Sequence, residues 1–208
     1  RDSVAWSLLF IFLLYFSAPA YAAFSKLEVY TNIIGSNIDS LNPWLFTWGE
    51  LGLIQVCGKN AASLQAAIDA YSGSGGLVIT YTGSFDFATI PDPCTQWKKP
   101  AGDIVEIKNK NDITIQGANG SAANFGLAIK AASSNIIIRN MTIGLLPGSI
   151  DAIGIEGQSG KYPGYIWVDH NTLFSSMAEC SGAGDLEFDG LVDNKAGAHH
   201  IPYSYNHL

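Results

Sequence analysis

Residues 166–173 read IWVDHNTL, and the same succession of apolar and polar positions recurs at 136–143 (IIIRNMTI) and at 201–208 (IPYSYNHL). Residues 113–117 (ITIQG) match its first five positions. The four segments start 23, 30 and 35 residues apart, and strands that recur at such intervals are typical of solenoids. Their first, third and eighth positions are mostly Ile, Val or Leu, so these side chains share one face of each strand.

The stretches between these strands lack the amphipathic helix of roughly 10 to 15 residues that connects the parallel strands of a doubly wound sheet. We therefore expect an all-β fold, a right-handed parallel β-helix. A sandwich with Greek-key connections is the alternative, because the repeats are few and unequal in length. The longer steps indicate coils enlarged by loops, which is where solenoids carry function.

One segment, residues 60–71, has a helical period. Its apolar residues Leu64, Ala67, Ile68 and Tyr71 are spaced three or four positions apart, which places them on one face of a helix. A strand is expected directly after it, at 77–81. A helix at this point would cap the open end of the solenoid, whose first coil otherwise exposes apolar side chains and unpaired backbone groups.

The amino-terminal segment has the pattern of a secretory signal peptide. The uncharged run 4–16 is followed by Ala20, Tyr21 and Ala22, a small-x-small cleavage sequence. We expect a signal peptide at residues 1–22, a secreted β-helix domain at 23–208 and no stable insertion in a membrane. The alternative, a membrane anchor, requires about 20 apolar residues.

The charge balance limits the possible partners. The 208 residues carry a net charge of −7, with only 14% charged residues, which argues against binding to the phosphate backbone of nucleic acid. An acidic partner would require local positive charge or a bridging cation. The three cysteines suit an oxidising compartment if one pair bonds and one thiol remains. We expect a monomer.

Three aspartates in the enlarged coils, Asp151, Asp189 and Asp193, are candidate Ca²⁺ ligands, because this ion takes several oxygen ligands. Four residues of extended strand span about 13 Å, so Asp189 and Asp193 share an ion only if the chain bends, and Gly190 is the position that permits a bend. The alternative is that each carboxylate accepts hydrogen bonds from turn amides, as aspartates in turns usually do.

Two pairs of residues that are adjacent in the sequence have the composition of functional sites. Asp169 and His170 have the composition of a catalytic dyad, and His199 and His200 that of a metal-binding pair. Adjacent residues of a strand point to opposite faces, so we expect neither pair to meet, and we expect a structural role for Asp169 and His170.

Read in order, these segments resemble the pectate lyase family. The resemblance is specific where Trp167, Asp169 and His170 form a Trp-x-Asp-His sequence, and where Asp189 and Asp193 form an Asp-x-x-x-Asp sequence. It extends from about residue 77 to 208, and it also rests on the following segments: SNIIIRN at 134–140, DAI at 151–153 and DGLVDNK at 189–195.

The resemblance implies a secreted parallel β-helix that cleaves α-1,4-linked polygalacturonate (pectate) by β-elimination with Ca²⁺. It implies that the calcium ligands are Asp151, Asp189 and Asp193. Asp169 and His170 match positions of the family's structural signature. Cys94 and Cys180 lie in the matched portions whereas Cys57 lies outside them, so we expect the first two to form the disulfide.

The chain departs from the family pattern at Ser149, where an acidic residue is common, and at Asn194, where an apolar residue is common. The family's proton-abstracting Arg and a substrate-binding Lys match nothing before Leu208. The chain is therefore expected to be an amino-terminal portion, incomplete at its carboxyl end and inactive as given. Lyase activity in this chain would require another base, to be sought among the following residues: Lys195, His199 and His200.

Two other functions remain open from the sequence. A pectin lyase acts on methylated substrate without calcium, and the three aspartates argue against it. A non-catalytic module that binds acidic polysaccharide through calcium has the same aspartates and lacks only the base.

Overall fold

The structure is a computed structural model that describes residues 46–48 (backbone only), 53–99, 103–182, 188 and 190–208. The expected signal peptide, residues 1–22, and the predicted ligand Asp189 lie outside the described residues. Within these ranges there is no helix with the length and apolar character needed to cross a bilayer.

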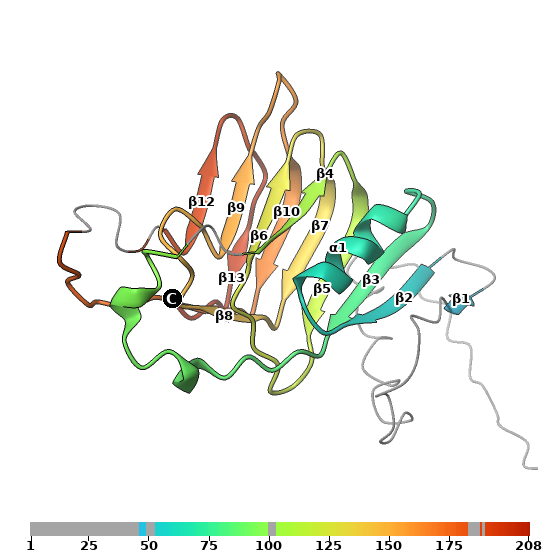
Figure 1. Ribbon diagram of the computed structural model, residues 1–208. Coiled ribbons are helices and arrows are strands. Elements are labelled where there is room, and N and C mark those ends of the chain that lie inside the picture. Colours follow the sequence, from blue (N-terminus) through green and yellow to red (C-terminus); the bar gives the residue numbers. More distant parts are fainter. Residues whose placement is uncertain (1–45, 49–52, 100–102, 183–187, 189) are drawn as a thin grey trace, which may run out of the picture. The chain divides into compact units, whose positions relative to one another are not determined.

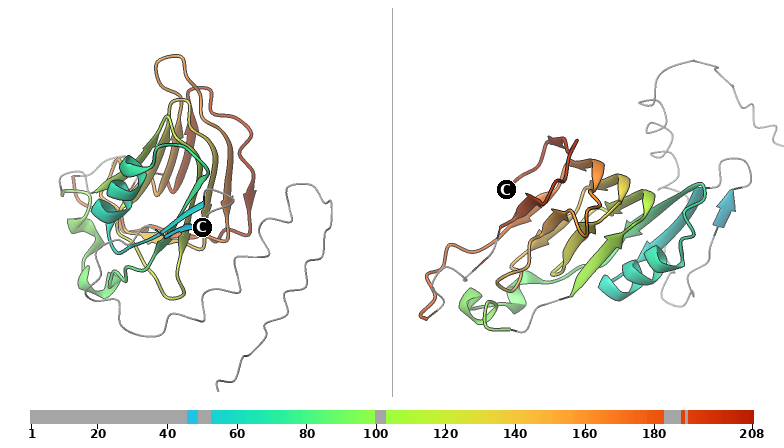
Figure 2. Two further views of the ribbon diagram at one scale, coloured as in Figure 1. Left: turned by 90° about the vertical axis from the view of Figure 1, so that its right-hand side faces the viewer. Right: turned by 90° about the horizontal axis from the view of Figure 1, so that it is seen from above.

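The described strands form three sheets, and successive turns of the chain add strands to the edges of these sheets (Figures 1 and 2). The first sheet consists of, in order, β1 (Phe46–Trp48), β2 (Leu53–Gly58), β3 (Gly76–Tyr81), β5 (Asn111–Gly117), β7 (Ser134–Arg139), β10 (Gly164–Asp169) and β13 (Tyr203–Ser204). The second consists of β4 (Ile104–Lys108), β6 (Gly126–Lys130), β9 (Ile153–Glu156) and β12 (Val192–Lys195). The third pairs β8 (Thr142–Gly144) with β11 (Thr172–Phe174). All these pairings are parallel except that of β1 with β2.

The register of the first sheet confirms the sequence repeat. Ile136 pairs with both Ile113 and Ile166, and the third position of the repeat stacks in the same way, since Val168 pairs with Tyr203. The isoleucines that start the repeats at 113, 136 and 166 are almost completely buried. Each coil thus covers the apolar face of the coil before it, so the expected parallel β-helix is confirmed and the sandwich alternative is wrong.

The predicted helix is present as α1 (Ala61–Ala70), and Asn60 caps it by accepting a hydrogen bond from the Ser63 backbone N–H. Its apolar face packs against β2, β3 and β4. The helix also covers the edge of the second sheet, through Gln65. The side-chain oxygen of Gln65 accepts a hydrogen bond from the Glu106 N–H at 2.7 Å, and its side-chain nitrogen donates one to the Glu106 carbonyl at 3.1 Å. These two bonds replace those of a neighbouring strand, which β4 lacks on this side among the described residues.

The corners of the coils correct one sequence-based expectation. Residues at these corners adopt a left-handed conformation: His170, directly after β10, has φ +51°, and His200, shortly before β13, has φ +54°. Alternation of side chains holds only within extended backbone, so it fails at these corners. The prediction that Asp169 and His170 do not meet is therefore wrong, as is the same prediction for His199 and His200: their side chains are in contact, at 2.8 and 2.7 Å respectively.

Asn171, in the corner after β10, links three coils. Its carbonyl oxygen accepts a bond from the Met141 N–H at 3.0 Å, and its amide donates to the Ile138 carbonyl and to the Asn206 side chain, each at 3.0 Å. The side chain is 1% exposed. It satisfies backbone groups that the turn leaves without partners in regular secondary structure.

We expect Asn171→Ala to lower the free energy of unfolding by about 3 kcal/mol, because two buried backbone groups lose their partners at about 1–3 kcal/mol each. Urea unfolding of the purified chain measures the change. Asn119→Ala is the control, since Asn119 is an exposed turn residue whose replacement should cost less than about 0.5 kcal/mol. Equal effects of the two substitutions would contradict the role assigned to Asn171.

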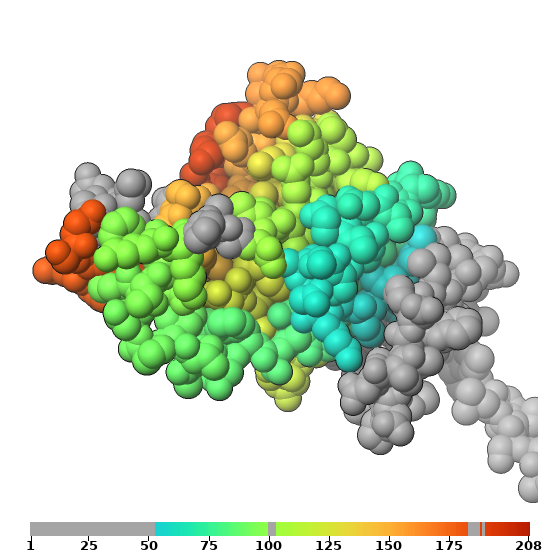
Figure 3. All heavy atoms as spheres, in the orientation of Figure 1, coloured from blue at the N-terminus to red at the C-terminus, as the bar shows by residue number. Residues whose placement is uncertain are grey.

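The disulfide joins Cys94 to Cys180, as the resemblance implied, with their Cα atoms 5.2 Å apart. Cys94 lies in η4 (Pro93–Thr95), a short 3₁₀ helix that follows another one, η3 (Phe87–Thr89). Figure 3 shows the segment around Cys94, in green, against the orange segment that carries Cys180. Cys57 is exposed and carries a free thiol.

Candidate metal centre

The outward face of the second sheet carries two rows of side chains that cross its four strands. One row consists of positions in direct register: Glu106, Ala128, Gly154 and Asp193. Neighbouring strands lie about 4.8 Å apart. The two central residues, Ala128 and Gly154, have little or no side chain. The acidic residues Glu106 on β4 and Asp193 on β12 lie at the two ends of the row.

The side chain of Asp151 lies beside Gly154, one of the two central residues. Asp151 precedes β9, and a Cβ atom added to Gly154 would lie 3.2 Å from its Oδ2. A Cβ atom added to Gly190 would lie 3.4 Å from its Oδ1. The carboxylate of Asp151 therefore lies against two glycines, one in β9 and one just before β12. Asp193 is the register partner of Gly154 on the adjacent strand. Asp151 and Asp193 therefore both lie next to Gly154.

Lys195 forms an ion pair with one of these carboxylates. Its Nζ lies 2.8 Å from Oδ2 of Asp193. The hydrogen bond that Lys195 donates to Asp193 raises the pKa of Lys195; burial opposes this rise, and the charges of Asp193, Glu156 and Asp151 add to it. The charge of Asp151 thus reaches Lys195, and the carboxylates of this face hold the ammonium group in its charged form.

The donor set fits a hard cation. Asp151 and Asp193 offer carboxylate oxygens, the ligands Ca²⁺ prefers. In the ranges that the structure describes, no group of three or more His, Cys, Asp or Glu side chains converges. The third predicted ligand, Asp189, lies outside these ranges.

The second row of the same face is Lys108, Lys130, Glu156 and Lys195, again in direct register. Nζ of Lys130 lies 3.0 Å from a carboxylate oxygen of Glu106. The sequence interpretation did not single out Lys108, Lys130 or Glu106. The sequence does contain a pattern that places these side chains on the outward face. In IVEIK at 104–108 and GLAIK at 126–130, the charged residues alternate with buried apolar residues.

Asp169 and His170 form a different centre, on the first sheet. The buried Asp169 carboxylate accepts a hydrogen bond from the Ser204 hydroxyl at 2.5 Å, and its other oxygen lies 2.8 Å from Nδ1 of His170. Trp167 donates its indole N–H to the same hydroxyl at 2.8 Å. Because the serine donates to the carboxylate and not to an imidazole, it lacks the base that activates a nucleophile. The contacts link β10 to β13, in agreement with the expected structural role.

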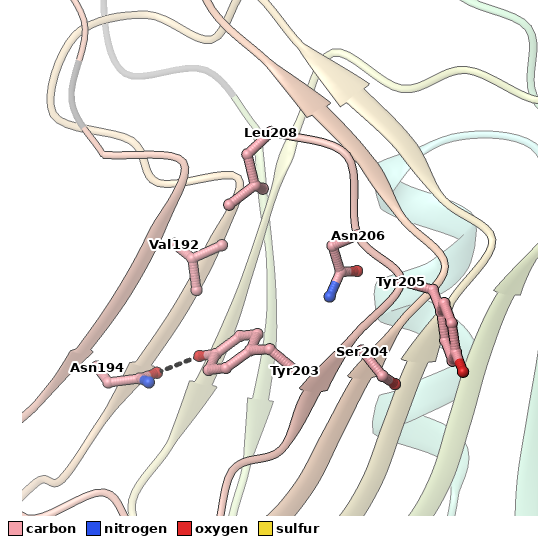
Figure 4. Close-up of a pocket in the computed structure, with 7 residues that line it drawn as sticks. All are labelled: Val192, Asn194, Tyr203, Ser204, Tyr205, Asn206 and Leu208. Carbon is pink, nitrogen blue, oxygen red and sulfur yellow. Dashed lines mark hydrogen bonds between the residues drawn. The ribbon is translucent and has the colours of Figure 1, made fainter.

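A pocket of about 410 Å³ lies at the end of the solenoid formed by β12 and β13 (Figure 4). Its lining residues are Val192, Asn194, Tyr203, Ser204, Tyr205, Asn206 and Leu208. Val192 and Asn194 alternate with Asp193 and Lys195, so they face the interior of the coil while the candidate ligands face outward. The departure at Asn194 has a local explanation, since its side-chain oxygen accepts a hydrogen bond from the Tyr203 hydroxyl at 2.7 Å.

Comparison with known proteins places these features in a family. A family model described as pectate lyase matches residues 56–208. Pectate lyase B of Dickeya chrysanthemi is 43% identical over 172 residues, a region that covers 72% of this chain and 44% of that protein. Pectate lyase C of the same organism is 44% identical over 142 residues, which cover 64% of this chain and 36% of that protein.

Solved structures agree with the sequence comparison. Pectate lyase II from Xanthomonas campestris pv. campestris superimposes with a TM-score of 0.71 at 58% identity, over 73% of this chain and 46% of that one. A structure of pectate lyase C from Erwinia chrysanthemi with Ca²⁺ superimposes with a TM-score of 0.66 at 37% identity, over 74% of this chain and 47% of that one. A mutant of the latter enzyme has been solved in complex with pentagalacturonic acid. The matched region is less than half the length of these relatives.

Proposed function

The chain belongs to the pectate lyase family, and on this premise we propose that it acts in the calcium-assisted cleavage of α-1,4-linked polygalacturonate by β-elimination. The observation that carries the proposal is the Asp151 carboxylate, which lies against Gly154 beside Asp193 on the outward face of the second sheet. A bound cation at this place would supply the attraction for a uronate that a protein of net charge −7 lacks.

We assign the calcium ligands to Asp151, Asp189 and Asp193. A cation held there would attract the uronate carboxylate and would make the C5 proton more acidic by withdrawing charge from the sugar. Lys195 neutralises Asp193 in the structure, so its ammonium group would have to release this carboxylate before Asp193 could serve as a ligand. Glu156 is the register partner of Lys195 and offers an alternative acceptor on the adjacent strand.

The elimination itself needs a base. The base removes the proton from C5, a double bond forms between C4 and C5, and the glycosidic C4–O bond breaks with its electron pair on the departing oxygen, which is then protonated. The family resemblance implies an Arg as this base, and no residue of the 208 matches it. If the 208 residues prove active alone, the candidates are Lys195, His199 and His200.

The location that we propose is extracellular, after removal of residues 1–22, and the protein is proposed to be a monomer. The disulfide Cys94–Cys180 supports the location, because disulfides persist in oxidising compartments. Amino-terminal sequencing of secreted protein should read Ala23-Phe24-Ser25. Secreted protein that retains the apolar run 4–16 would contradict the cleavage.

Equilibrium binding of oligogalacturonate to the 208-residue chain tests the proposal. We expect binding in the presence of Ca²⁺, loss of binding with a chelator, and loss in Asp193→Asn. Gly154→Val is a second test, since its side chain displaces the Asp151 carboxylate without removing a charge. Binding that survives the chelator would contradict the calcium bridge, and equal binding of methyl-esterified oligomers would favour the pectin lyase alternative.

Release of unsaturated product, followed by its ultraviolet absorbance, separates the enzyme from a non-catalytic module. We expect no release from the 208 residues alone and release when they form part of a chain that supplies the base. Calcium-dependent binding without release by such a chain would favour the binding module.

A further inference from the structure

His199 and His200 lie in the turn between β12 and β13, outside the candidate metal centre. Their two Nδ1 atoms are 2.7 Å apart, and both side chains are exposed. The left-handed conformation of His200, with φ +54°, brings these adjacent rings together. At this distance one ring donates the N–H and the other accepts it, so a single proton lies between two imidazole nitrogens.

Packing against the preceding coil holds both rings. The His199 ring covers Gly164, where an added Cβ atom would lie only 2.6 Å from Nδ1 of His199. The His200 ring stacks on Tyr165, with ring centroids 4.8 Å apart and an interplanar angle of 16°. The backbone is fixed as well, because His199 donates to the Pro163 carbonyl at 3.1 Å and His200 accepts from the Ile166 N–H at 3.2 Å.

We propose that His199 and His200 form a binding site for a first-row transition-metal ion, with Cu²⁺ as the preferred ion. The ring that carries the shared proton on Nδ1 takes its other tautomer, with the proton on Nε2, so that both Nδ1 atoms bind the ion from one side. Imidazole nitrogen suits Cu²⁺, Ni²⁺ and Zn²⁺ and does not suit Ca²⁺. The site is therefore chemically distinct from the carboxylates of Asp151 and Asp193, and it does not rest on the proposed function.

The distance between the nitrogens favours one geometry. Two metal–nitrogen bonds of about 2.05 Å at a right angle place the nitrogens about 2.9 Å apart, whereas a tetrahedral angle places them about 3.3 Å apart. The observed 2.7 Å is closer to the right angle, which is the arrangement of square-planar or tetragonal Cu²⁺ and Ni²⁺. The described residues bring no third His, Cys, Asp or Glu side chain into such a group, so water completes the coordination at these exposed rings.

Titration of the 208-residue chain with Cu²⁺, in a Cys57→Ser background and with excess Ca²⁺, tests the proposal. The background removes the exposed thiol, which also binds copper, and Ca²⁺ occupies the carboxylates. We expect one equivalent of Cu²⁺ to bind with an electron paramagnetic resonance spectrum of two imidazole nitrogens. His199→Gln and His200→Asn should each raise the Kd by about a hundredfold, because the second ligand then no longer acts within the same site.

The variants are chosen to preserve the fold. Asn tolerates the left-handed conformation required at position 200, and unchanged thermal unfolding without copper verifies that both variants fold. His207→Gln is the matched control, since His207 is an exposed histidine in another corner of the same coil, and it should leave the Kd unchanged. A spectrum with one nitrogen, or a Kd that neither His199→Gln nor His200→Asn changes, would overturn the proposal.

Discussion

Replacement of both Cys94 and Cys180 by Ser is expected to lower the free energy of unfolding by about 4 kcal/mol, because the bond closes a loop of 86 residues and so restricts the unfolded chain. That loop contains most of the stacked coils, from β4 to β11. In the folded protein the bond joins two segments with little regular structure, η4 and the residues after β11.

Urea unfolding of the double variant against the parent measures this change. Cys57→Ser is the matched control, since it removes an exposed thiol that forms no disulfide, and it should alter the free energy of unfolding by less than about 0.5 kcal/mol. A loss below about 1 kcal/mol in the double variant would mean that the unfolded chain is already restricted without the bond.

Asp193→Asn is expected to abolish most of the stabilisation that Ca²⁺ gives to the folded chain. An ion that binds only the native state contributes about 2.7 kcal/mol at a hundredfold excess over its Kd. The substitution replaces a charged carboxylate ligand with a neutral amide oxygen, which binds Ca²⁺ more weakly beside Asp151. Unfolding curves with Ca²⁺ and with a chelator, at constant ionic strength, give the difference directly.

The control for this experiment is Asp69→Asn. Asp69 is an exposed carboxylate of α1 that accepts a hydrogen bond from Gln65, and an amide oxygen accepts the same bond. It should retain the full effect of calcium. Loss of the calcium effect in both variants would point to a general charge effect, and its retention in Asp193→Asn would remove Asp193 from the ligand set.

The ion pair between Lys195 and Asp193 adds a pH dependence with a defined sign. Because the folded state raises the pKa of Lys195, chiefly through the hydrogen bond that Lys195 donates to Asp193, the pair stabilises the fold while the lysine is charged. This contribution is present below the pKa of lysine in the unfolded chain and is lost as the pH rises through the raised value. Asp193→Asn removes the largest part of this dependence, so the parent and the variant should converge in stability at strongly alkaline pH when calcium is absent.

The local sequence pattern was sufficient to predict the architecture of the coils. The isoleucines at 113, 136 and 166 predicted the strands and their register, and the structure confirms both. This was possible because the alternation of side chains is a local property of extended backbone, and because each coil must cover the apolar face of the one before it. The apolar period of 60–71 predicted the capping helix for the same reason.

Contacts between coils set the arrangement at the corners and on the outward face. Asn and His tolerate the left-handed conformation and Tyr rarely adopts it, yet Asn140, His170 and Tyr205 all adopt it at the same position of the repeat, so the stacked coils impose this corner. This imposed conformation, which no local pattern revealed, brings Asp169 to His170 and His199 to His200. Likewise, Asp151 lies against Gly154 and Gly154 pairs with Asp193 because β9 and β12 are adjacent strands. The proximity of two aspartates 42 positions apart therefore depends on that pairing and not on the sequence around either residue.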